Sequence, residues 1–125
     1  MTFGESVSTC IKKYFVFEGR ASRSEYWWFQ LIVSPSYFIS TVFENDIAYI
    51  FLGITLFTLI PAISAGVRRL HDTNRSGFFL LISFIPFIGG LILLFFLIPE
   101  GTKGKNRFGP DPLKRLLRKR KRKKK

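Results

Sequence analysis

Three long uncharged stretches alternate with short polar segments along this chain. They cover residues 26–43, 47–67 and 78–98 and contain 18, 21 and 21 residues. Because an α-helix rises about 1.5 Å per residue, each stretch would form a helix roughly 27–32 Å long, close to the hydrocarbon thickness of a bilayer. The pattern therefore predicts an all-α, polytopic helical membrane protein built on three apolar segments.

The third stretch differs from the first two because residues that break helices lie in its middle. Pro86 and the pair Gly89-Gly90 interrupt it. Non-helical backbone at membrane depth is tolerated where protein or water satisfies its hydrogen bonds. We therefore expect either one kinked span or a re-entrant hairpin of two short halves.

An amphipathic helix is predicted before the first stretch, from Thr2 to Glu18, with Gly19 ending it. Its apolar residues recur at helical spacing on one face, and they are Val7, Cys10, Ile11, Tyr14 and Phe15. This face fits either the membrane surface or the protein's own core. We favour the membrane surface, because a bilayer lies next to this helix.

Polar and aromatic residues mark the start of the first stretch. Ser22 and Glu25 have capping-box spacing, so we expect the Glu25 carboxylate to cap the helix. Amphipathic aromatic side chains favour the headgroup level of a bilayer. We expect an aromatic belt of this kind at Tyr26, Trp27 and Trp28.

Charge is distributed in blocks between the apolar stretches. The chain has 125 residues, of which 47% are hydrophobic, yet its formal net charge is +12. This segregation is typical of proteins whose loops face water and whose helices face lipid. We therefore divide the chain into a membrane domain, 1–112, and a basic tail, 113–125, which we expect to be disordered.

The basic residues also predict an orientation. Lys and Arg number four before Tyr26, three in the loop 68–77 and 13 after Ile98. The positive-inside rule places the N-terminus and this loop in the cytoplasm, and residues 44–46 outside. Three simple spans would carry the most basic segment, the tail, outside. We favour a re-entrant third stretch with a cytoplasmic tail over translocation of the tail against the rule.

Three short motifs flank the apolar stretches. They read GRASRSEYW at 19–27, RRLHD at 68–72 followed by RSG at 75–77, and GT at 101–102 followed by NRFGPDP at 106–112. In this order they resemble the YhaH-like family of small bacterial inner-membrane proteins, known as domain of unknown function 805. The resemblance covers about 13–112 and implies a bacterial inner-membrane protein of several helices, with no established reaction. Lys103 stands where Pro is usual, and the basic stretch beyond Pro112 looks like an addition.

Polar residues of the first two motifs form a candidate site. Because the first two stretches are joined by a short turn, their cytoplasmic ends should meet, and we expect one polar cluster there. Arginine side chains suit phosphate recognition. The cluster is therefore a candidate site for an anionic ligand or lipid headgroup, made of Arg20, Arg23, Arg68, Arg69, His71, Asp72 and Arg75.

Two other interpretations of this cluster stay open. In the structural one, Asp72 pairs with an arginine of the other segment. In the catalytic one, His71 acts as a general base oriented by Asp72, although adjacent residues of a helix do not face each other. We predict no catalytic residue. With Cys10 as the single cysteine and no Cys/His cluster, we predict no metal and no cofactor.

The tail and the apolar stretches together define the expected partners. Lys/Arg clusters beside a membrane span bind anionic phospholipids, and nucleic acid is disfavoured because no folded nucleic-acid motif accompanies the tail. A protein partner or a homo-oligomer stays open. We expect a membrane-embedded binding or accessory module with a cationic cytoplasmic surface. The alternative is a small-solute transporter or channel subunit acting as an oligomer, for which a broken third segment is typical.

Overall fold

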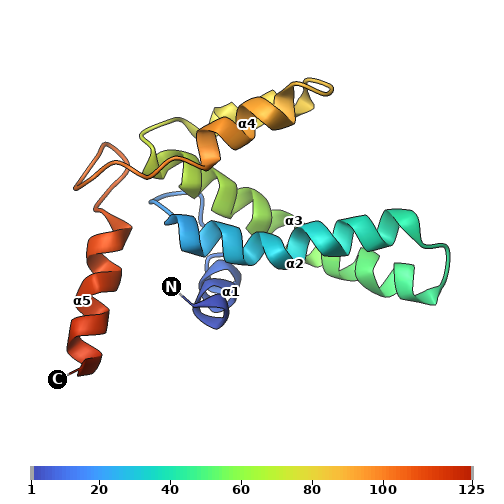
Figure 1. Ribbon diagram of the computed structural model, residues 1–125, viewed down its shortest axis with the longest axis horizontal. Helices are drawn as coiled ribbons and strands as arrows, with labels where there is room; N and C mark the ends of the chain where they lie inside the picture. Colours follow the sequence, from blue (N-terminus) through green and yellow to red (C-terminus); the bar gives the residue numbers. More distant parts are fainter. Residues whose placement is uncertain (1, 125) are drawn as a thin grey trace.

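The computed structural model describes residues 2–124, and within them it contains helices and no strand. The helices, in chain order, are α1 (Phe3–Lys12), α2 (Arg23–Val42), α3 (Asp46–Asp72), the 3-10 helix η1 (Gly77–Phe84), α4 (Gly89–Leu97) and α5 (Pro112–Lys124). Figure 1 shows two arms, α2 with α3 and η1 with α4, that extend from a shared base, where α1 and α5 also lie. The predicted all-α class is confirmed.

Helices α2 and α3 form an antiparallel hairpin joined by a short turn. The side chain of Ser22 accepts a hydrogen bond from the backbone of Glu25 at the start of α2, and that of Asn45 accepts one from Ala48 at the start of α3. Small residues let the hairpin and its neighbours approach closely: a Cβ atom on Gly66 would lie 3.3 Å from a methyl carbon of Leu80. The hairpin therefore brings the start of α2 next to the end of α3.

Helix α1 differs from its prediction in length and in environment. It ends at Lys12, and not at Glu18. Its apolar face packs on the protein itself, because Cys10 is fully buried while Val7 and Ile11 pack against the same core. The expected preference for the membrane surface was wrong for this face. Phe15 lies beyond the helix and is exposed.

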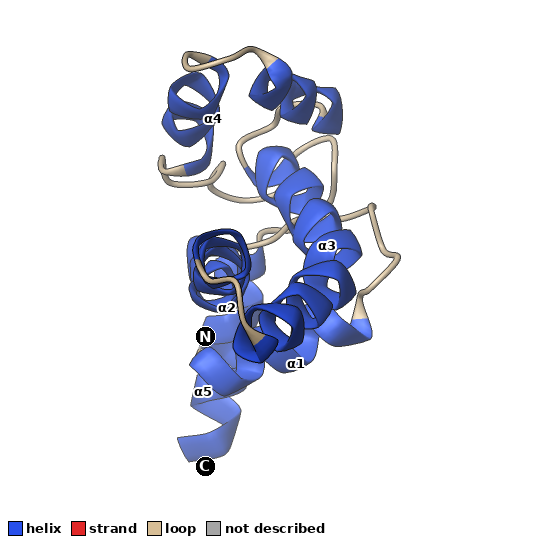
Figure 2. Cartoon of the chain, turned by 90° about the vertical axis from the view of Figure 1, so that its right-hand side faces the viewer, coloured by secondary structure: helices blue, strands red, loops and turns tan. Residues whose placement is uncertain are grey.

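The third apolar stretch forms two short helices that fold back on each other. η1 and α4 have 8 and 9 residues, so their lengths are roughly 16 and 14 Å, about half the hydrocarbon thickness. Between them Phe87 has a φ of 67°. A Cβ atom on Gly89 would lie 2.0 Å from the carbonyl oxygen of Ile82, so glycine is required where the halves meet. Figure 2 shows this hairpin on the opposite side of α3 from α1.

One helix of the described residues, α3, is long and apolar enough to cross a membrane by length and composition. Many of its large apolar side chains face outward, among them Ile50, Leu56 and Phe57. The aromatic belt predicted at the start of α2 does not include Tyr26. Trp28 is 40% exposed, but Tyr26 is buried in the core cluster.

The segment after α4 forms a loop, 98–111, followed by helix α5. The backbones of Asn106 and Gly109 form two hydrogen bonds with each other and close a tight turn. The tail was expected to be disordered, but residues Pro112–Lys124 form α5, and Lys125 lies outside the described residues. The Asp111 carboxylate accepts a hydrogen bond from the backbone of Leu113 at 3.0 Å and so caps the first turn of α5.

Candidate functional site: a buried arginine network

The three motifs converge at the base of the two arms. The start of α2 and the end of α3 meet there because the hairpin is antiparallel, and the backbone N–H of Ala21 donates to the carbonyl of Arg68 at 3.0 Å. The 98–111 loop joins them, because the backbone N–H of Thr102 donates to the carbonyl of Asp72 at 2.7 Å. The base network, as we call it, consists of Arg20, Glu25, Arg68, Arg69 and Asp72, all of them buried.

The carboxylate of Asp72 bridges two arginines from different segments. Nε of Arg20 donates to Oδ1 of Asp72 at 2.9 Å, and Nη1 of Arg69 donates to Oδ2 at 2.6 Å. The side chains of all three residues are at most 4% exposed. Charge-assisted hydrogen bonds of this kind are stronger than neutral ones. The predicted proximity of Arg20, Arg69 and Asp72 is therefore confirmed. Asp72 pairs with an arginine of the other segment, as the structural interpretation predicted.

Most of the other hydrogen bonds of Arg20 and Arg69 go to backbone carbonyls at the end of α4 and in the loop that follows it. Arg20 donates from Nη1 to Gly104 at 2.6 Å and from Nη2 to Thr102. Arg69 donates from Nε to Leu97 at 3.1 Å. Its Nη2 donates to the carbonyl of Pro99. The two guanidinium groups thus fasten the 98–111 loop and the end of α4 to the α2–α3 hairpin.

Gly101 lies directly against the shared carboxylate. A Cβ atom at this position would lie 2.0 Å from Oδ2 of Asp72. The carboxylate cannot move aside at low cost, because Arg20 and Arg69 hold both of its oxygens. The close approach of the loop to Asp72 therefore requires a glycine at position 101.

A second ion pair lies beneath α1. Nη1 of Arg68 donates to the carboxylate of Glu25, and the hydroxyl of Ser6 donates to the Glu25 carbonyl. The Glu25 carboxylate therefore pairs with Arg68, which corrects its expected role as the cap of α2. Nε and Nη2 of Arg68 are buried without a hydrogen-bond partner among the described residues. Burial, and secondarily the charge of Glu25, raise the pKa of the Cys10 thiol to about 11.

His71 is oriented by groups other than Asp72. Its Nδ1 lies 2.9 Å from the carbonyl oxygen of Gly19, and its ring stacks on Phe108 with centroids 3.9 Å apart. Because the Asp72 carboxylate binds Arg20 and Arg69 instead, the two side chains form no acid–base pair.

Besides His71, two predicted site residues lie outside the base network. Arg75 places its guanidinium carbon 4.6 Å from the centre of the Phe96 ring, a cation–π contact to α4. Arg23 is exposed and forms no ion pair with a described residue. The structure thus places four of the seven candidates in the base network, which are Arg20, Arg68, Arg69 and Asp72. His71 contacts Gly19 and Phe108 instead.

Sequence reasoning missed the partners that occupy these arginines. The acceptors are backbone carbonyls of Leu97, Pro99, Thr102 and Gly104, which no residue type reveals. The one hint in the sequence was Gly101, because a glycine often marks a place where the backbone approaches another group closely. Among residues 2–124, no group of three or more His, Cys, Asp and Glu side chains is placed to hold a metal ion.

The apolar helices meet at a polar base, and the three motifs occur there in a fixed order. This combination indicates a small helical membrane protein. The chain belongs to the family described as "Protein of unknown function (DUF805)", whose model matches residues 14–110. This range contains the base network and ends before α5.

Two relatives from Escherichia coli K12 are similar over most of their length. Inner membrane protein YhaI is 44% identical over 106 residues, which is 82% of this chain and 90% of the relative. Inner membrane protein YhaH is 39% identical over 112 residues, which is 82% of this chain and 91% of the relative. No solved structure matches significantly. These findings confirm the family resemblance and support the predicted bacterial inner-membrane location.

Proposed function

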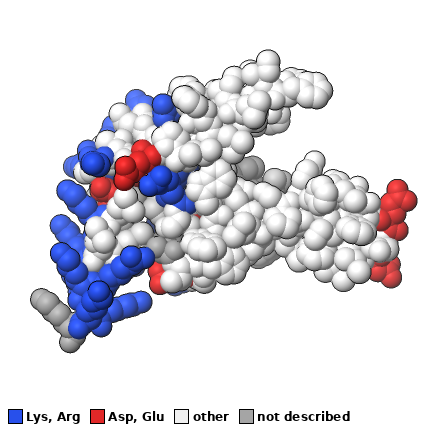
Figure 3. Space-filling view, in the orientation of Figure 1, with Lys and Arg blue, Asp and Glu red and all other residues white. Residues whose placement is uncertain are grey.

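We propose that this protein is a membrane-embedded accessory module that holds anionic phospholipid at a cationic cytoplasmic surface. The observation that carries the proposal is the segregation of charge. In Figure 3 the Lys and Arg side chains gather at the base and along α5, while the two arms present almost uncharged surfaces. A basic face beside lipid-facing helices is the arrangement that attracts anionic headgroups.

The contacts at the base support an orientation with three segments on one side of the membrane. Arg20 of the first motif binds Asp72 of the second and Gly104 of the third. Segments that share hydrogen bonds cannot lie on opposite sides of a bilayer. The short lengths of η1 and α4 agree with a re-entrant hairpin that enters and leaves from this side. By the positive-inside rule this side is the cytoplasm.

The exposed cations are better suited to hold headgroups than the buried ones. Arg20 and Arg69 already use their N–H groups within the chain. By contrast, Arg23 and nearly all of α5 are exposed. In this proposal the base network fixes the geometry of the cytoplasmic face, and the lipid contacts are made outside it.

Transport through an oligomer is a second candidate, and the broken third segment favours it, since transporter sites use discontinuous helices. Against transport, residues 47–67 and 78–98 contain no charged side chain, and ion pathways usually use buried ionisable groups. Solute flux by the protein in reconstituted vesicles, absent from empty vesicles, would establish this alternative.

The proposal is tested by the lipids that remain bound to the protein after purification in mild detergent. We expect anionic phospholipid to be enriched relative to the starting membrane. Replacing Arg118, Arg120 and Arg122 by Gln should reduce this enrichment, whereas replacing the same three by Lys, which keeps the charge, should preserve most of it. Lipid composition equal to that of the starting membrane in the unmodified protein would contradict the proposal.

A further inference from the structure

Two adjacent basic cavities lie along α5. The first has a volume of about 450 Å³ and lies between α5 and the 98–111 loop; its lining includes the cations Lys105, Lys114, Arg115, Arg118, Lys119 and Arg122. The second has a volume of about 250 Å³ and lies between α5 and α1; its lining includes Lys12, Lys13, Arg20, Arg115 and Lys119. Each cavity has one lining carboxylate, Asp111 in the first and Glu25 in the second.

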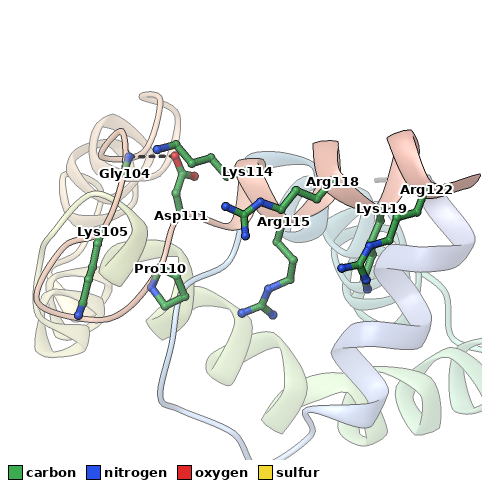
Figure 4. Close-up of a pocket in the computed structure, with 9 residues that line it drawn as sticks. All are labelled: Gly104, Lys105, Pro110, Asp111, Lys114, Arg115, Arg118, Lys119 and Arg122. Carbon is green, nitrogen blue, oxygen red and sulfur yellow. Dashed lines mark hydrogen bonds between the residues drawn. The ribbon is translucent and has the colours of Figure 1, made fainter.

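The two cavities share the side chains of Arg115 and Lys119. These residues are four apart, so they lie on the same face of α5. Figure 4 shows Arg115, Lys119 and Arg122 extending from the same side of the helix. The shared pair therefore lies between two adjacent cationic pockets rather than inside one.

The two carboxylates offset little of this charge, because Asp111 supplies one negative charge against the six cations that line the first cavity. Glu25 is paired with the buried Arg68, and Asp111 is occupied by the backbone N–H groups of Gly104 and Leu113. Within residues 2–124, the described ion pairs include no cation of α5. Burial lowers the pKa of Lys13, Glu25 opposes this shift, and the nearby cations Arg68 and Arg115 add to it.

Like charges four residues apart destabilise an isolated helix. Arg115 with Lys119, Lys114 with Arg118, and Arg118 with Arg122 are such pairs, and all of them line the cavities. A multivalent anion between α5 and the base would remove this repulsion. Since the pockets are adjacent and share two cations, phosphate groups on one molecule could occupy both.

We infer that the paired pockets bind one anion carrying two phosphate groups, such as the headgroup of cardiolipin, with Arg115 and Lys119 contacting both phosphates. This inference rests on the proposed function and adds to it a preference for lipids with two phosphate groups over lipids with one. Phosphatidylglycerol, which carries one phosphate, fills one pocket and leaves the charge of the other unbalanced. α5 lies outside the matched family range, so the cations that it contributes to the site are not part of that range.

The test compares cardiolipin and phosphatidylglycerol at equal total phosphate, using native mass spectrometry of the full-length protein in mild detergent. We expect at least tenfold tighter binding of cardiolipin. The double variant R115Q/K119Q should lose most of this preference, because one basic residue near an anionic surface is worth about fivefold in affinity. The control R120Q/K123Q removes the same charge from residues that line neither pocket, and it should keep the preference.

The outcomes separate this inference from the proposed function. Equal binding of the two lipids, or equal loss of preference in both double variants, would overturn the two-phosphate site and leave anionic-lipid binding standing. If the protein retains no anionic lipid at all, both the inference and the proposed function are overturned.

A competition experiment identifies the kind of ligand. Displacement of cardiolipin by submillimolar inorganic diphosphate would support the site and assign it to a soluble ligand, whereas cardiolipin that stays bound in the presence of diphosphate would assign the site to lipid. Tighter binding of an RNA oligomer than of cardiolipin would overturn the inference. Circular dichroism and elution volume verify that each variant is folded.

Discussion

Two arginine-rich regions lie at the same end of this protein and differ in how their charges are satisfied. In the base network, Arg20, Arg68 and Arg69 are buried, and two carboxylates together with a set of backbone carbonyls receive most of their N–H groups. In α5 the cations are exposed, and among the described residues they have no carboxylate partner in an ion pair. Apart from Nε and Nη2 of Arg68, the arginines of the first region find their partners within the chain, whereas the second region is open to an external anion.

The difference shows that the role of an arginine follows from its partners more than from its charge. A buried guanidinium with five N–H groups can organise several backbone segments at once, provided that acceptors surround it. An exposed guanidinium contributes little to stability but remains available to phosphate. Four predictions probe this difference.

The largest expected effect is from Asp72→Asn. This change removes the charge that both Arg20 and Arg69 require, and breaking a buried ion pair costs about 3–5 kcal/mol. We expect a large loss of the free energy of unfolding, measured by denaturation in detergent. Asp46→Asn, at the exposed start of α3, is the matched control and should change stability much less. Equal effects of the two substitutions would mean that the base network does not stabilise the fold.

The reactivity of cysteine should distinguish the interior from the tail. Cys10 is fully buried and its pKa is raised to about 11, so below that pH the thiol stays protonated and unreactive. We expect a maleimide at pH 8 to modify Cys10 at least about a hundredfold more slowly than a cysteine introduced by Leu117→Cys in α5, in the C10S background. Comparable rates would show that the face of α1 that carries Cys10 is not packed against the core. Unfolding the protein should make Cys10 fully reactive.

Gly101→Ala should destabilise the protein by an intermediate amount. The new methyl group would meet a carboxylate that two arginines hold in place, and overpacking of this kind costs about 1–3 kcal/mol. Gly90→Ala in α4 is the control, because a Cβ atom there has no neighbour within 4 Å. It should be neutral or slightly stabilising, since alanine favours helix. Denaturation midpoints of the two variants measure the difference.

The smallest effect on stability is expected from substitutions of arginines in α5. Replacing Arg118 and Arg122 by Gln should shift the melting temperature by no more than about 3 °C, because exposed charges contribute little to folding. The same variant should bind anionic lipid more weakly at low salt, with the difference shrinking as salt screens the charges. A loss of stability similar to that of Asp72→Asn would show that α5 is part of the folded core.

The helical class and the hairpin of the first two stretches could be predicted because they depend on local signals. Uncharged stretches, the short turn at 44–46 and caps such as Ser22 are properties of neighbouring residues. The break at Pro86 and Gly89 likewise indicated that the third stretch would not be a simple helix. These features need no knowledge of distant contacts.

The partners of the arginines could not be predicted in the same way. Arg20 reaches Gly104, 84 residues later, and the acceptor is a carbonyl that every residue carries. The end of α1 was also missed, because the apolar spacing continues to Phe15 while the helix stops at Lys12. The helical tail was missed because like charges disfavour a helix, whereas the cap from Asp111 favours one.

The long reach of Arg20 and Arg69 has a consequence for the order of biogenesis. Both residues are synthesised before their carbonyl acceptors at 97–104, so during translation their N–H groups bind water or headgroups. The base network can therefore close only after the chain has been synthesised as far as Gly104. A nascent chain that stops before Leu97 lacks all four of these acceptors and leaves the two guanidinium groups without them.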